Sequence, residues 1–551
     1  MAAAVPQLDV HMEDLRRLVE RTRQAPLSDD EYTTLKAAID TLGYVADLLE
    51  QKGTTLASLR QLLFGATTEK TRQVLAQAGV DVTSADDSGG DGSSSESDRQ
   101  GPDRRARGHG RHGAAAYAGA QRIDVPHPQL HHGDRCPHCI TGKLYVQREP
   151  GLLIRFRGQA PIAATVYALE KLRCNLCGDL FTADPPPGVG AEKYDATAGA
   201  MIAMLKYGSG MPFHRLAHLQ ANLEMPLPAS TQWEIVADLA THLQPVLHEL
   251  TLQAAQGEIL HNDDTSMTVL TLGGQGLARG DPDADGVSPD RTGVFTSAVV
   301  STREGQRIAL FLTGRRHAGE NLARVLAARA ADLGPPIQMC DALTRNVPKP
   351  LTVILGHCLA HARRHVVNVT PSFPEEGRYI LERVRDVYRH DADARERRLS
   401  PADRLAFHQA HSGPLMDQLH AWLRAQLDEH RVEPNSGLGR AIAYFLKHWT
   451  PLTLFLRQPG APLDNNIVER SLKRAILHRK NSYFYRTSNG AHVGDLFMSL
   501  IHTCELAGAN AFDYLTALQR HAPALKQDPP VWMPWNYQET LTNVETATAT
   551  T

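Results

Sequence analysis

The sequence predicts a multidomain α+β protein with a mixed sheet near its middle and helical stretches before and after that sheet. Its 551 residues are too many for one ordinary domain. Short segments with β-like patterns are concentrated after residue 257, whereas helical spacing dominates elsewhere. A Ser-, Gly- and Asp-rich stretch at 82–102 cannot bury enough apolar surface to order itself and therefore separates the N-terminal segment from the rest.

Composition restricts the function classes. Hydrophobic residues make up 42% of the chain and charged residues 22%, as in globular proteins. No apolar run approaches the roughly 20 residues that span a bilayer, and the N-terminus lacks a secretory pattern, so we expect no membrane segment and a cytoplasmic location. A net charge of −3 excludes a uniformly basic DNA-coating protein, but it leaves room for a local basic surface that contacts DNA.

The N-terminal region, residues 1–81, is expected to be helical. Residues 29–64 carry apolar side chains at helical spacing, which indicates either a coiled coil that dimerises or a helix packed on its own domain. Residues 82–115 form a linker that ends in a basic stretch around Arg104 and Arg111. That stretch is either a DNA-touching arm or a solvated tail.

Two CxxC units define a module at 116–190. Cys136 and Cys139 are followed after 34 residues by Cys174 and Cys177, with β-rich sequence between the pairs. Each CxxC turn can direct two thiolates at one ion, and two such turns complete a closed tetrahedral site. We therefore expect structural Zn²⁺ rather than a redox role, which a lone CxxC would have favoured.

Residues 191–250 are expected to be helical, with a Pro-containing break that fits either a helix-turn-helix or a plain helical hairpin. From 251 to 365 the order is three short strands, a helix near 318–331 and a further strand ending at 340. This is the order of an RNase H-like core, in which acidic residues at strand ends converge on metal ions.

Three acids are the candidate catalytic residues. Asp263, beside Asp264, ends the first strand, Asp341 follows the last strand, and Glu469 lies on an expected helix that opens near Asp464 or Asn465. Three carboxylates can hold two Mg²⁺ ions about 4 Å apart for phosphoryl transfer on DNA. With 61 acidic residues in the chain, some strand-end aspartates are inevitable, so spacing alone does not settle the assignment.

Cations and aromatic residues surround these acids. The helix of Glu469 and its exit carry positive charge that fits either DNA phosphates or a solvated basic face, namely Arg470, Lys473, Arg474, Arg479 and Lys480. His361 and Arg364, in the segment HCLAHARRH, are candidates for phosphate contact. The run Tyr483–Tyr485 is expected either to stack on an unpaired base or to be buried in a strand.

The chain resembles the insertion sequence 66 family of transposases (TnpC type) over nearly its whole length. The matching stretches, in chain order, are RQLLFGATTEKT, the two CxxC units, KYGSGMPFHRL, LHNDDT, IQMCDA, GHCLAHARRH, LGRAIAYFLKHW, LDNNIVERSLKRAILHRKNSYFY and GAHVGDLFMSLIHTCELAGANAFDYL. The resemblance implies a DDE nuclease core whose acids fall on Asp263, Asp341 and Glu469. It departs after Asp341, where the family commonly has a DGY-like tripeptide and this chain has Asp-Ala-Leu.

The resemblance also implies how the C-terminal half is organised and what the protein binds. A mostly helical insertion at 366–460 separates the first part of the core from a second part at 461–520, and a tail follows at 521–551. The expected activity is metal-dependent cleavage at the ends of an insertion sequence, with Mg²⁺ or Mn²⁺, and strand transfer into target DNA. We expect a homodimer or higher oligomer on DNA, accessory proteins encoded by the same element, and nucleoid association.

Two rival functions remain at this point. The chain could be a catalytically silent zinc-containing regulator that binds DNA, or an RNase H-like nuclease without strand transfer. Metal-dependent nicking separates the first rival from an enzyme, and joining of a cleaved end to other DNA separates the second.

Overall fold

The computed structural model describes residues 192–272, 293–349 and 351–549, shorter stretches between 128 and 190, and a few single residues. By their contacts these residues form two units, one from Leu169 onward and a smaller one within Gly92–Ala168. Each unit is described by itself. Within the described residues, no helix is both long enough and apolar enough to cross a membrane.

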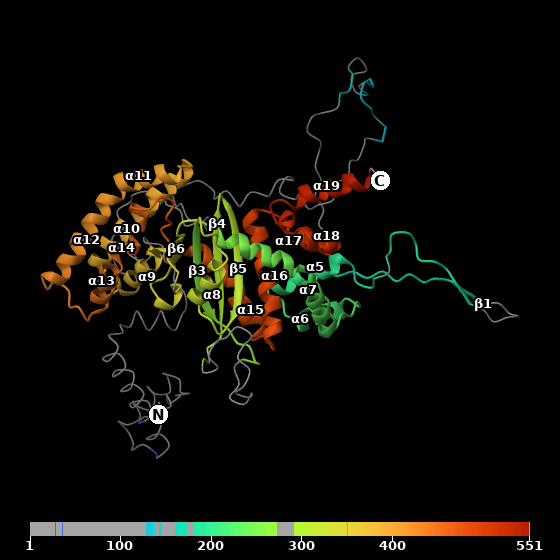
Figure 1. Ribbon diagram of the computed structural model, residues 1–551, viewed down its shortest axis with the longest axis horizontal. Coiled ribbons are helices and arrows are strands. Elements are labelled where there is room, and N and C mark those ends of the chain that lie inside the picture. The colour runs from blue at the N-terminus through green and yellow to red at the C-terminus, as the bar shows by residue number, and fades with distance from the viewer. Residues whose placement is uncertain are drawn as a thin grey trace. The chain divides into compact units, whose positions relative to one another are not determined.

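A five-stranded mixed sheet forms the centre of the larger unit (Figure 1). Its strands are β3 (Ile259–Ser266), β4 (Phe295–Arg303), β5 (Gln306–Gly314), β6 (Ile337–Cys340) and β7 (Ile354–His357). The spatial order is β5-β4-β3-β6-β7. Strands β3, β4 and β5 are antiparallel neighbours, whereas β6 pairs parallel to both β3 and β7. The carboxyl ends of β3 and β6 therefore meet at one edge of the sheet.

Helices cover both faces of this sheet. Helix α8 (Ala318–Leu326) and the end of α7 (Ala229–Ala255) pack against one face, and α15 (Asn466–Ser482) packs against the other. Before α7 the chain forms α5 (Ala196–Ala203), a π-helical turn at Met204–Gly208 and α6 (Phe213–Asn222). The two short strands β1 (Lys171–Arg173) and β2 (Leu180–Thr182) form a separate antiparallel pair.

Helix α16 (Ser488–Ala507) closes the free edge of the sheet at β5. The backbone N–H groups of Ala309, Phe311 and Thr313 donate to Thr503 Oγ1 (3.1 Å), Ser499 Oγ (2.9 Å) and Asp495 Oδ2 (2.6 Å). Every second strand residue thus meets every fourth helix residue, because two strand residues and four helix residues both advance about 6–7 Å. The edge that would otherwise pair with another chain is satisfied by side chains.

Seven further elements make the region between β7 and α15 almost entirely helical, and they gather at one end of the sheet in Figure 1. They are α9 (Leu359–Val369), α10 (Pro374–Glu396), α11 (Pro401–His411), α12 (Gly413–Asp428), α13 (Gly437–Lys447), α14 (Trp449–Leu452) and the short 3₁₀ turn at Leu454–Leu456. Another 3₁₀ turn, Thr344–Asn346, lies between β6 and β7.

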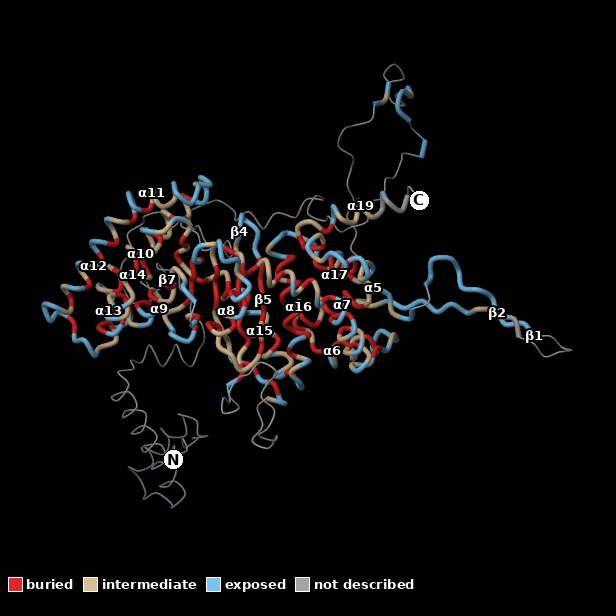
Figure 2. Tube along the Cα trace, viewed as in Figure 1, coloured by how far each residue is buried: buried red, intermediate tan, exposed pale blue. Residues whose placement is uncertain are grey.

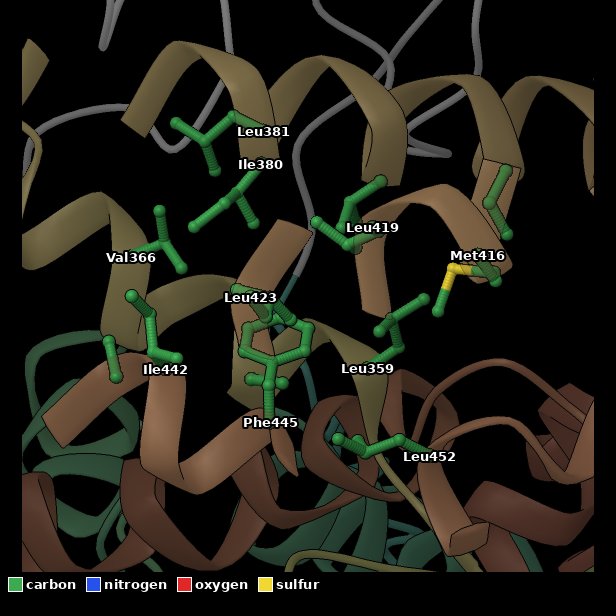
Figure 3. Packing of buried hydrophobic residues seen from close by; sticks show 14 of the residues in the cluster. Leu359, Val366, Ile380, Leu381, Met416, Leu419, Leu423, Ile442, Phe445 and Leu452 are labelled. Atoms are coloured by element: carbon green, nitrogen blue, oxygen red, sulfur yellow. The ribbon is translucent and has the colours of Figure 1, made fainter. Parts of the chain in front are cut away.

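These helices share one apolar core. Leu359, Ile380, Leu423 and Phe445 are fully buried, and Figure 3 shows how they and their neighbours point toward one another from separate helices. Burial of each such side chain stabilises the fold by roughly 1.5–3 kcal/mol. The same cluster includes Ile337 of β6, so the helical region packs directly on the sheet.

The C-terminal helices complete the unit on the other side of α16. They are α17 (Ala511–Arg520), α18 (Ala522–Gln527), a 3₁₀ turn at Pro529–Trp532 and α19 (Tyr537–Ala549). Trp532 is buried and its carbonyl accepts a hydrogen bond from Tyr514 Oη (2.7 Å), so the tail segment packs on α17. Figure 2 shows the buried residues concentrated along the sheet and the helix faces that touch it.

Candidate active site

Strand β3 directs its two adjacent aspartates to opposite faces of the sheet. Side chains alternate along a strand, and here the contacts show which face each residue takes. His261 Nδ1 lies 3.1 Å from Asn465 Oδ1 at the start of α15, so the odd-numbered residues, Asp263 among them, face α15. Asp264 Oδ2 lies 3.0 Å from His317 Nδ1 at the start of α8, on the other face.

A buried amide joins Asp263 to Asp341. Asn346 Nδ2 lies 2.5 Å from Asp341 Oδ1 and 3.3 Å from Asp263 Oδ1, and the Asn346 side chain is inaccessible to solvent. The backbone carbonyl of Asn346 accepts from Asn262 Nδ2 and Gln338 Nε2, both at 2.7 Å, which fixes the residue to β3 and β6. Two acids from different strands are therefore held around one donor.

The electrostatics of Asp263 reflect this crowding. Burial, together with the neighbouring carboxylates of Asp341, Asp264 and Glu469, raises the pKa of the Asp263 carboxyl to about 7. A hydrogen bond from the Asp264 backbone N–H (2.8 Å) opposes these effects in part. Like charges gathered in a half-buried pocket are what a bound divalent cation would relieve.

The Asp264 carboxylate is bound by residues on the opposite face of the sheet from Asp263. Its carboxylate accepts a hydrogen bond from the Ala318 backbone N–H (3.2 Å) at the N-terminus of α8 and lies 3.3 Å from an Arg345 guanidinium nitrogen. His317 completes the set, and the Asp264 side chain is only 1% exposed. Positive charge and a helix N-terminus together hold this anion in place. Asp264 thus binds the start of α8. Of the two adjacent acids, Asp263 is the one that faces α15.

Glu469 lies in the first turn of α15, whose start is fixed by Asn465. The Asn465 side chain is buried, and besides contacting His261 it donates from Nδ2 to the Asn262 carbonyl (3.1 Å). Its backbone N–H donates to Cys358 Sγ (3.2 Å). The side chain of Asn465 thus binds β3, and that of the next residue, Asn466, donates from Nδ2 to Asp464 Oδ2 (3.0 Å).

His361 and Cys358 accompany Glu469. His361 Nδ1 lies 3.4 Å from Glu469 Oε1, and among the described residues neither of these buried atoms has a hydrogen-bond partner. One ligand atom each of Cys358, His361 and Glu469 fall within 4.8 Å of one another, which is a distance range that one metal ion could bridge. Burial raises the pKa of the Cys358 thiol to about 12, so this sulfur is a weak ligand beside the carboxylates.

The chemistry of these donors suits a divalent cation. Asp263, Asp341 and Glu469, from β3, the end of β6 and α15, carry the hard oxygen donors that Mg²⁺ or Mn²⁺ prefers. The Glu469 Oε1 atom is buried without a hydrogen bond among the described residues, so it is free to accept a ligand bond.

The cations expected to contact DNA divide into two groups. Arg470, Lys473 and Lys480 are exposed on α15 and have no ion-pair partner among the residues that the structure describes. Arg474, by contrast, is paired with Glu505 and donates to the Gly208 carbonyl, and Arg479 donates to Thr265 Oγ1 (3.1 Å) and Ser266 Oγ (2.7 Å). These two guanidinium groups tie α15 to its neighbours.

Arg364 is exposed on α9, as a phosphate contact requires. The aromatic run divides in a similar way. Tyr485 is buried and forms a bridge with Val269, whereas Tyr483 and Phe484 are exposed. The expectation of strand burial therefore holds for Tyr485 alone.

Several site residues escaped the sequence analysis. Asn346, His317 and Arg345 were not singled out, although all three contact Asp263 or its neighbour Asp264. Asn346 and Arg345 lie in a 3₁₀ turn a few residues after Asp341, without periodic signal. The only available signal was the concentration of polar residues in Asp341–Asn346, directly after a buried strand.

The predicted zinc ligands Cys136, Cys139, Cys174 and Cys177 lie outside the described residues, as does the predicted coiled coil at 29–64 apart from Lys36. The three cysteines that the structure does describe, Cys340, Cys358 and Cys504, are buried free thiols.

Comparison with known proteins gives a family match and distant relatives. Residues 193–493 match the model of the family described as Transposase IS66 family. The chain is 28% identical over 382 residues to the uncharacterized protein y4jD of Sinorhizobium fredii (strain NBRC 101917 / NGR234), covering 66% of this chain and 71% of that protein. The uncharacterized proteins y4hP and y4qI of the same organism are 27% and 24% identical.

The match covers 61% of y4hP and 62% of y4qI, so the chain spans less than two thirds of the length of these two relatives. No solved structure matches the chain significantly.

Proposed function

Because the chain belongs to the IS66 family of transposases, we propose that it cuts the ends of its own mobile DNA element and joins them to target DNA. The proposed active site is a DDE triad of Asp263, Asp341 and Glu469. The observation that carries this proposal is the link from Asp263 through Asn346 to Asp341, with Glu469 close enough to raise the pKa of Asp263. These contacts support one site built from three acids that are far apart in the sequence.

The proposed fold of the core is RNase H-like. Three antiparallel strands followed, across α8, by two strands parallel to the first support it. In this reading the helices between β7 and α15 are an insertion that delivers Glu469 from the far end of the chain.

Asp263, Asp341 and Glu469 would hold Mg²⁺ or Mn²⁺. When bound, such ions activate the attacking oxygen and stabilise the leaving oxygen of a phosphodiester. In the proposed first step, water attacks the phosphodiester at an element end, the P–O3′ bond breaks, and a 3′-hydroxyl is released. In the second, that 3′-hydroxyl attacks a target phosphodiester in line, so that one P–O bond forms while the target's P–O3′ bond breaks.

The chain's own residues position these groups. Asn346 binds both Asp263 and Asp341, and Asn465 ties the start of α15, whose first turn carries Glu469, to β3. Arg470, Lys473 and Lys480 would hold DNA phosphates along α15, joined by Arg364 on α9. His361, beside Glu469, restricts the orientation of that carboxylate.

The N-terminal modules have supporting roles in this proposal. Cys136, Cys139, Cys174 and Cys177, spaced as two CxxC pairs, would hold structural Zn²⁺ that orders a DNA-binding module. Residues 191–250 and a dimerising helix at 29–64 would add contacts to the element ends. Accessory proteins of the same element would assist.

The test uses a labelled duplex that carries the terminal repeats flanking the gene, with a plasmid as target and Mg²⁺ in the buffer. A transposase yields cleaved ends and labelled plasmid. Cleaved ends without labelled plasmid would replace the proposal by a nuclease, and binding without either product would replace it by a DNA-binding regulator.

A further inference from the structure

The exposed face of α15 forms a continuous stripe that leads away from Glu469. Its members are spaced alternately three and four residues apart, so they lie on one face of the helix. They are Arg470, Lys473, Leu477 and Lys480, followed after the helix by Phe484. The three cations have no ion-pair partner among the described residues, so the stripe presents uncompensated positive charge over its length.

Two exposed aromatic rings end this stripe. Tyr483 is 70% exposed and Phe484 is 43% exposed, and Leu477 of the stripe is 38% exposed. Large apolar side chains grouped on a surface carry a hydration cost, and such groups mark interaction sites more often than isolated ones do. The adjacent Tyr485 is 5% exposed, so the chain buries one ring of three and leaves the other two in solvent.

The backbone at Tyr483 is strained in a way that keeps these rings exposed. Tyr483 has φ 66° and ψ −45°, and the Phe484 N–H donates to the Ser482 carbonyl (2.8 Å) across it. This is a γ-turn with positive φ, a rare conformation that a bulky residue adopts only when its surroundings impose it.

Contacts of the residues before and after Tyr483 hold the turn in this conformation. Before the turn, Lys206 Nζ lies 2.8 Å from Ser482 Oγ, and Asn481 Nδ2 donates to the Gly210 carbonyl (3.0 Å). After the turn, Tyr485 pairs with the chain beside β3 through Thr268 and Leu270, and its ring stacks on His478 at 4.1 Å. The flanking residues are clamped, and only Tyr483 and Phe484 project.

Exposed apolar rings and a strained turn are each unfavourable in the free protein, and a ligand that covers the rings would offset both. Charge identifies the ligand class, because the rings continue a stripe of unpaired cations. A polyanion with flat apolar groups, which is to say a nucleic-acid strand with unpaired bases, matches phosphate-binding cations followed by aromatic rings.

We propose that Tyr483 and Phe484 form a stacking platform for unpaired bases of a DNA strand whose phosphates follow α15 from Glu469. This rests on the proposed function for the identity of the strand as DNA. Glu469 and Tyr483 are 14 residues apart, which is roughly 21 Å along a helix at about 1.5 Å per residue. At about 3.4 Å per nucleotide step, the platform would receive bases about six nucleotides from the cleaved bond.

The test compares two DNA probes with the full-length protein in buffer that contains EDTA. One is a blunt duplex, and the other is the same duplex with a single-stranded extension of about six nucleotides that carries 2-aminopurine. The double variant Tyr483→Gly/Phe484→Ala removes both rings, and glycine relieves the strained turn. Leu351→Ala, which trims an exposed apolar side chain just before β7, is the matched control.

Wild type and Leu351→Ala should bind the extended probe at least tenfold more tightly than the blunt one, with a change in 2-aminopurine emission. The double variant should lose that preference and the emission change while its blunt-duplex affinity stays within about twofold. Its thermal unfolding should be unchanged or shifted upward. Lys480→Ala should weaken binding of both probes alike.

Three results would overturn the platform: no preference in the wild type, an unchanged preference in the double variant, or loss of both affinities in equal proportion. An unchanged preference together with a shift to a smaller oligomer would assign the rings to contact between copies of the chain. Since the assay needs no cleavage, a retained preference in a protein that never cuts DNA rejects the proposed function alone. A lost preference in a protein that still transposes rejects the platform alone.

Discussion

At the scale of single residues, neighbouring side chains on β3 have opposite roles because a strand alternates its faces. The carboxylates of Asp341 and Glu469 raise the pKa of Asp263, whereas Asp264 lies beside Arg345 and His317 and accepts a hydrogen bond from the N-terminus of α8. Replacing Asp263 by a neutral residue removes a charge that destabilises the folded protein. Replacing Asp264 by a neutral residue removes a charge that stabilises it. Substitution at the two positions should therefore have opposite effects on stability.

Asp263→Asn should abolish metal-dependent cleavage and, in metal-free buffer, raise the free energy of unfolding by about 1–3 kcal/mol through relief of like-charge crowding. Asp264→Asn should lower it by a similar amount, because Arg345 and the start of α8 lose their anion. Denaturant unfolding of both variants measures the difference. Equal effects of the two substitutions would show that the alternation does not separate these acids.

Sequence reasoning found the acids but not the residues that hold them. Strand-end carboxylates are visible in a sequence because a β-like run ends at each of them. Asn346 is not visible in this way, since its role depends on the 3₁₀ turn that brings its amide between two strands. The partners of Arg474 and Arg479 were equally hidden, because a basic helix face reads the same whether its cations meet solvent or neighbouring helices.

At the scale of elements, the pairing of β5 with α16 explains how the sheet ends without an open edge. Three helix side chains four residues apart accept from three strand N–H groups two residues apart. Asp495 is the one carboxyl among these three acceptors; it is buried and also accepts a hydrogen bond from Thr313 Oγ1 (2.6 Å). Burial raises the pKa of Asp495 to about 7, despite the hydrogen bonds from Thr313.

The raised pKa of Asp495 predicts that the packing of α16 on the β5 edge becomes less stable as the pH rises. The pKa of Asp495 is about 7 in the folded protein and near 3.8 in the unfolded chain. The carboxyl therefore contributes its full stability only below pH 3.8, and this contribution is lost as the pH rises through about 7. Asp495→Asn keeps an acceptor for the Thr313 N–H and lacks the charge. Its stability relative to wild type should rise between pH 4 and pH 8, by on the order of 4 kcal/mol. Parallel stability curves would contradict the buried neutral carboxyl.

Ion pairing in the helical region should give the opposite trend. Burial raises the pKa of Asp391 on α10, but the hydrogen bond with His408 and the ion pair with Arg404 outweigh burial and lower it to about 2. Stability from this group is present above the unfolded value near 3.8 and is lost as the pH falls through 2.

Asp391→Asn should therefore cost about 2 kcal/mol at neutral pH, and the difference from wild type should shrink below pH 4. Denaturant unfolding of the variant and wild type between about pH 2.5 and about pH 7 measures this difference in the free energy of unfolding. A difference that stays constant on acidification would show that the carboxylate is not the group that matters.

At the scale of the whole molecule, the helical region and the sheet are one packed body. The apolar cluster of the helices includes Ile337 of β6, and Arg404 of α11 donates to the Ala461 carbonyl (2.8 Å) just before the helix of Glu469. Leu359 N–H donates to the Leu463 carbonyl (3.0 Å) in the same approach segment. The position of Glu469 relative to the aspartates thus depends on the packing of the helices that precede it.

The general layout was predictable and the long-range packing was not. Strand patterns after residue 257 and helical spacing elsewhere predicted the mixed sheet and the mostly helical content. Which residues close the sheet edge, and how the helical region rests on β6, depend on contacts between segments about 190 residues apart, such as Phe311 and Ser499. No local pattern encodes such contacts.

The central claim, that Asp263, Asp341 and Glu469 act as one metal-dependent centre, is tested most directly by cleavage of element-end DNA by matched pairs of variants. Asp341→Asn and Glu469→Gln remove one charge each with little change in shape, and Asp332→Asn and Glu258→Gln do the same at exposed acids near the same strands. With Mg²⁺ present, the first pair should lose cleavage by a factor of about 10³ or more while retaining the fold and end binding. The second pair should cleave like wild type. Wild-type rates in Asp341→Asn or Glu469→Gln would contradict the account.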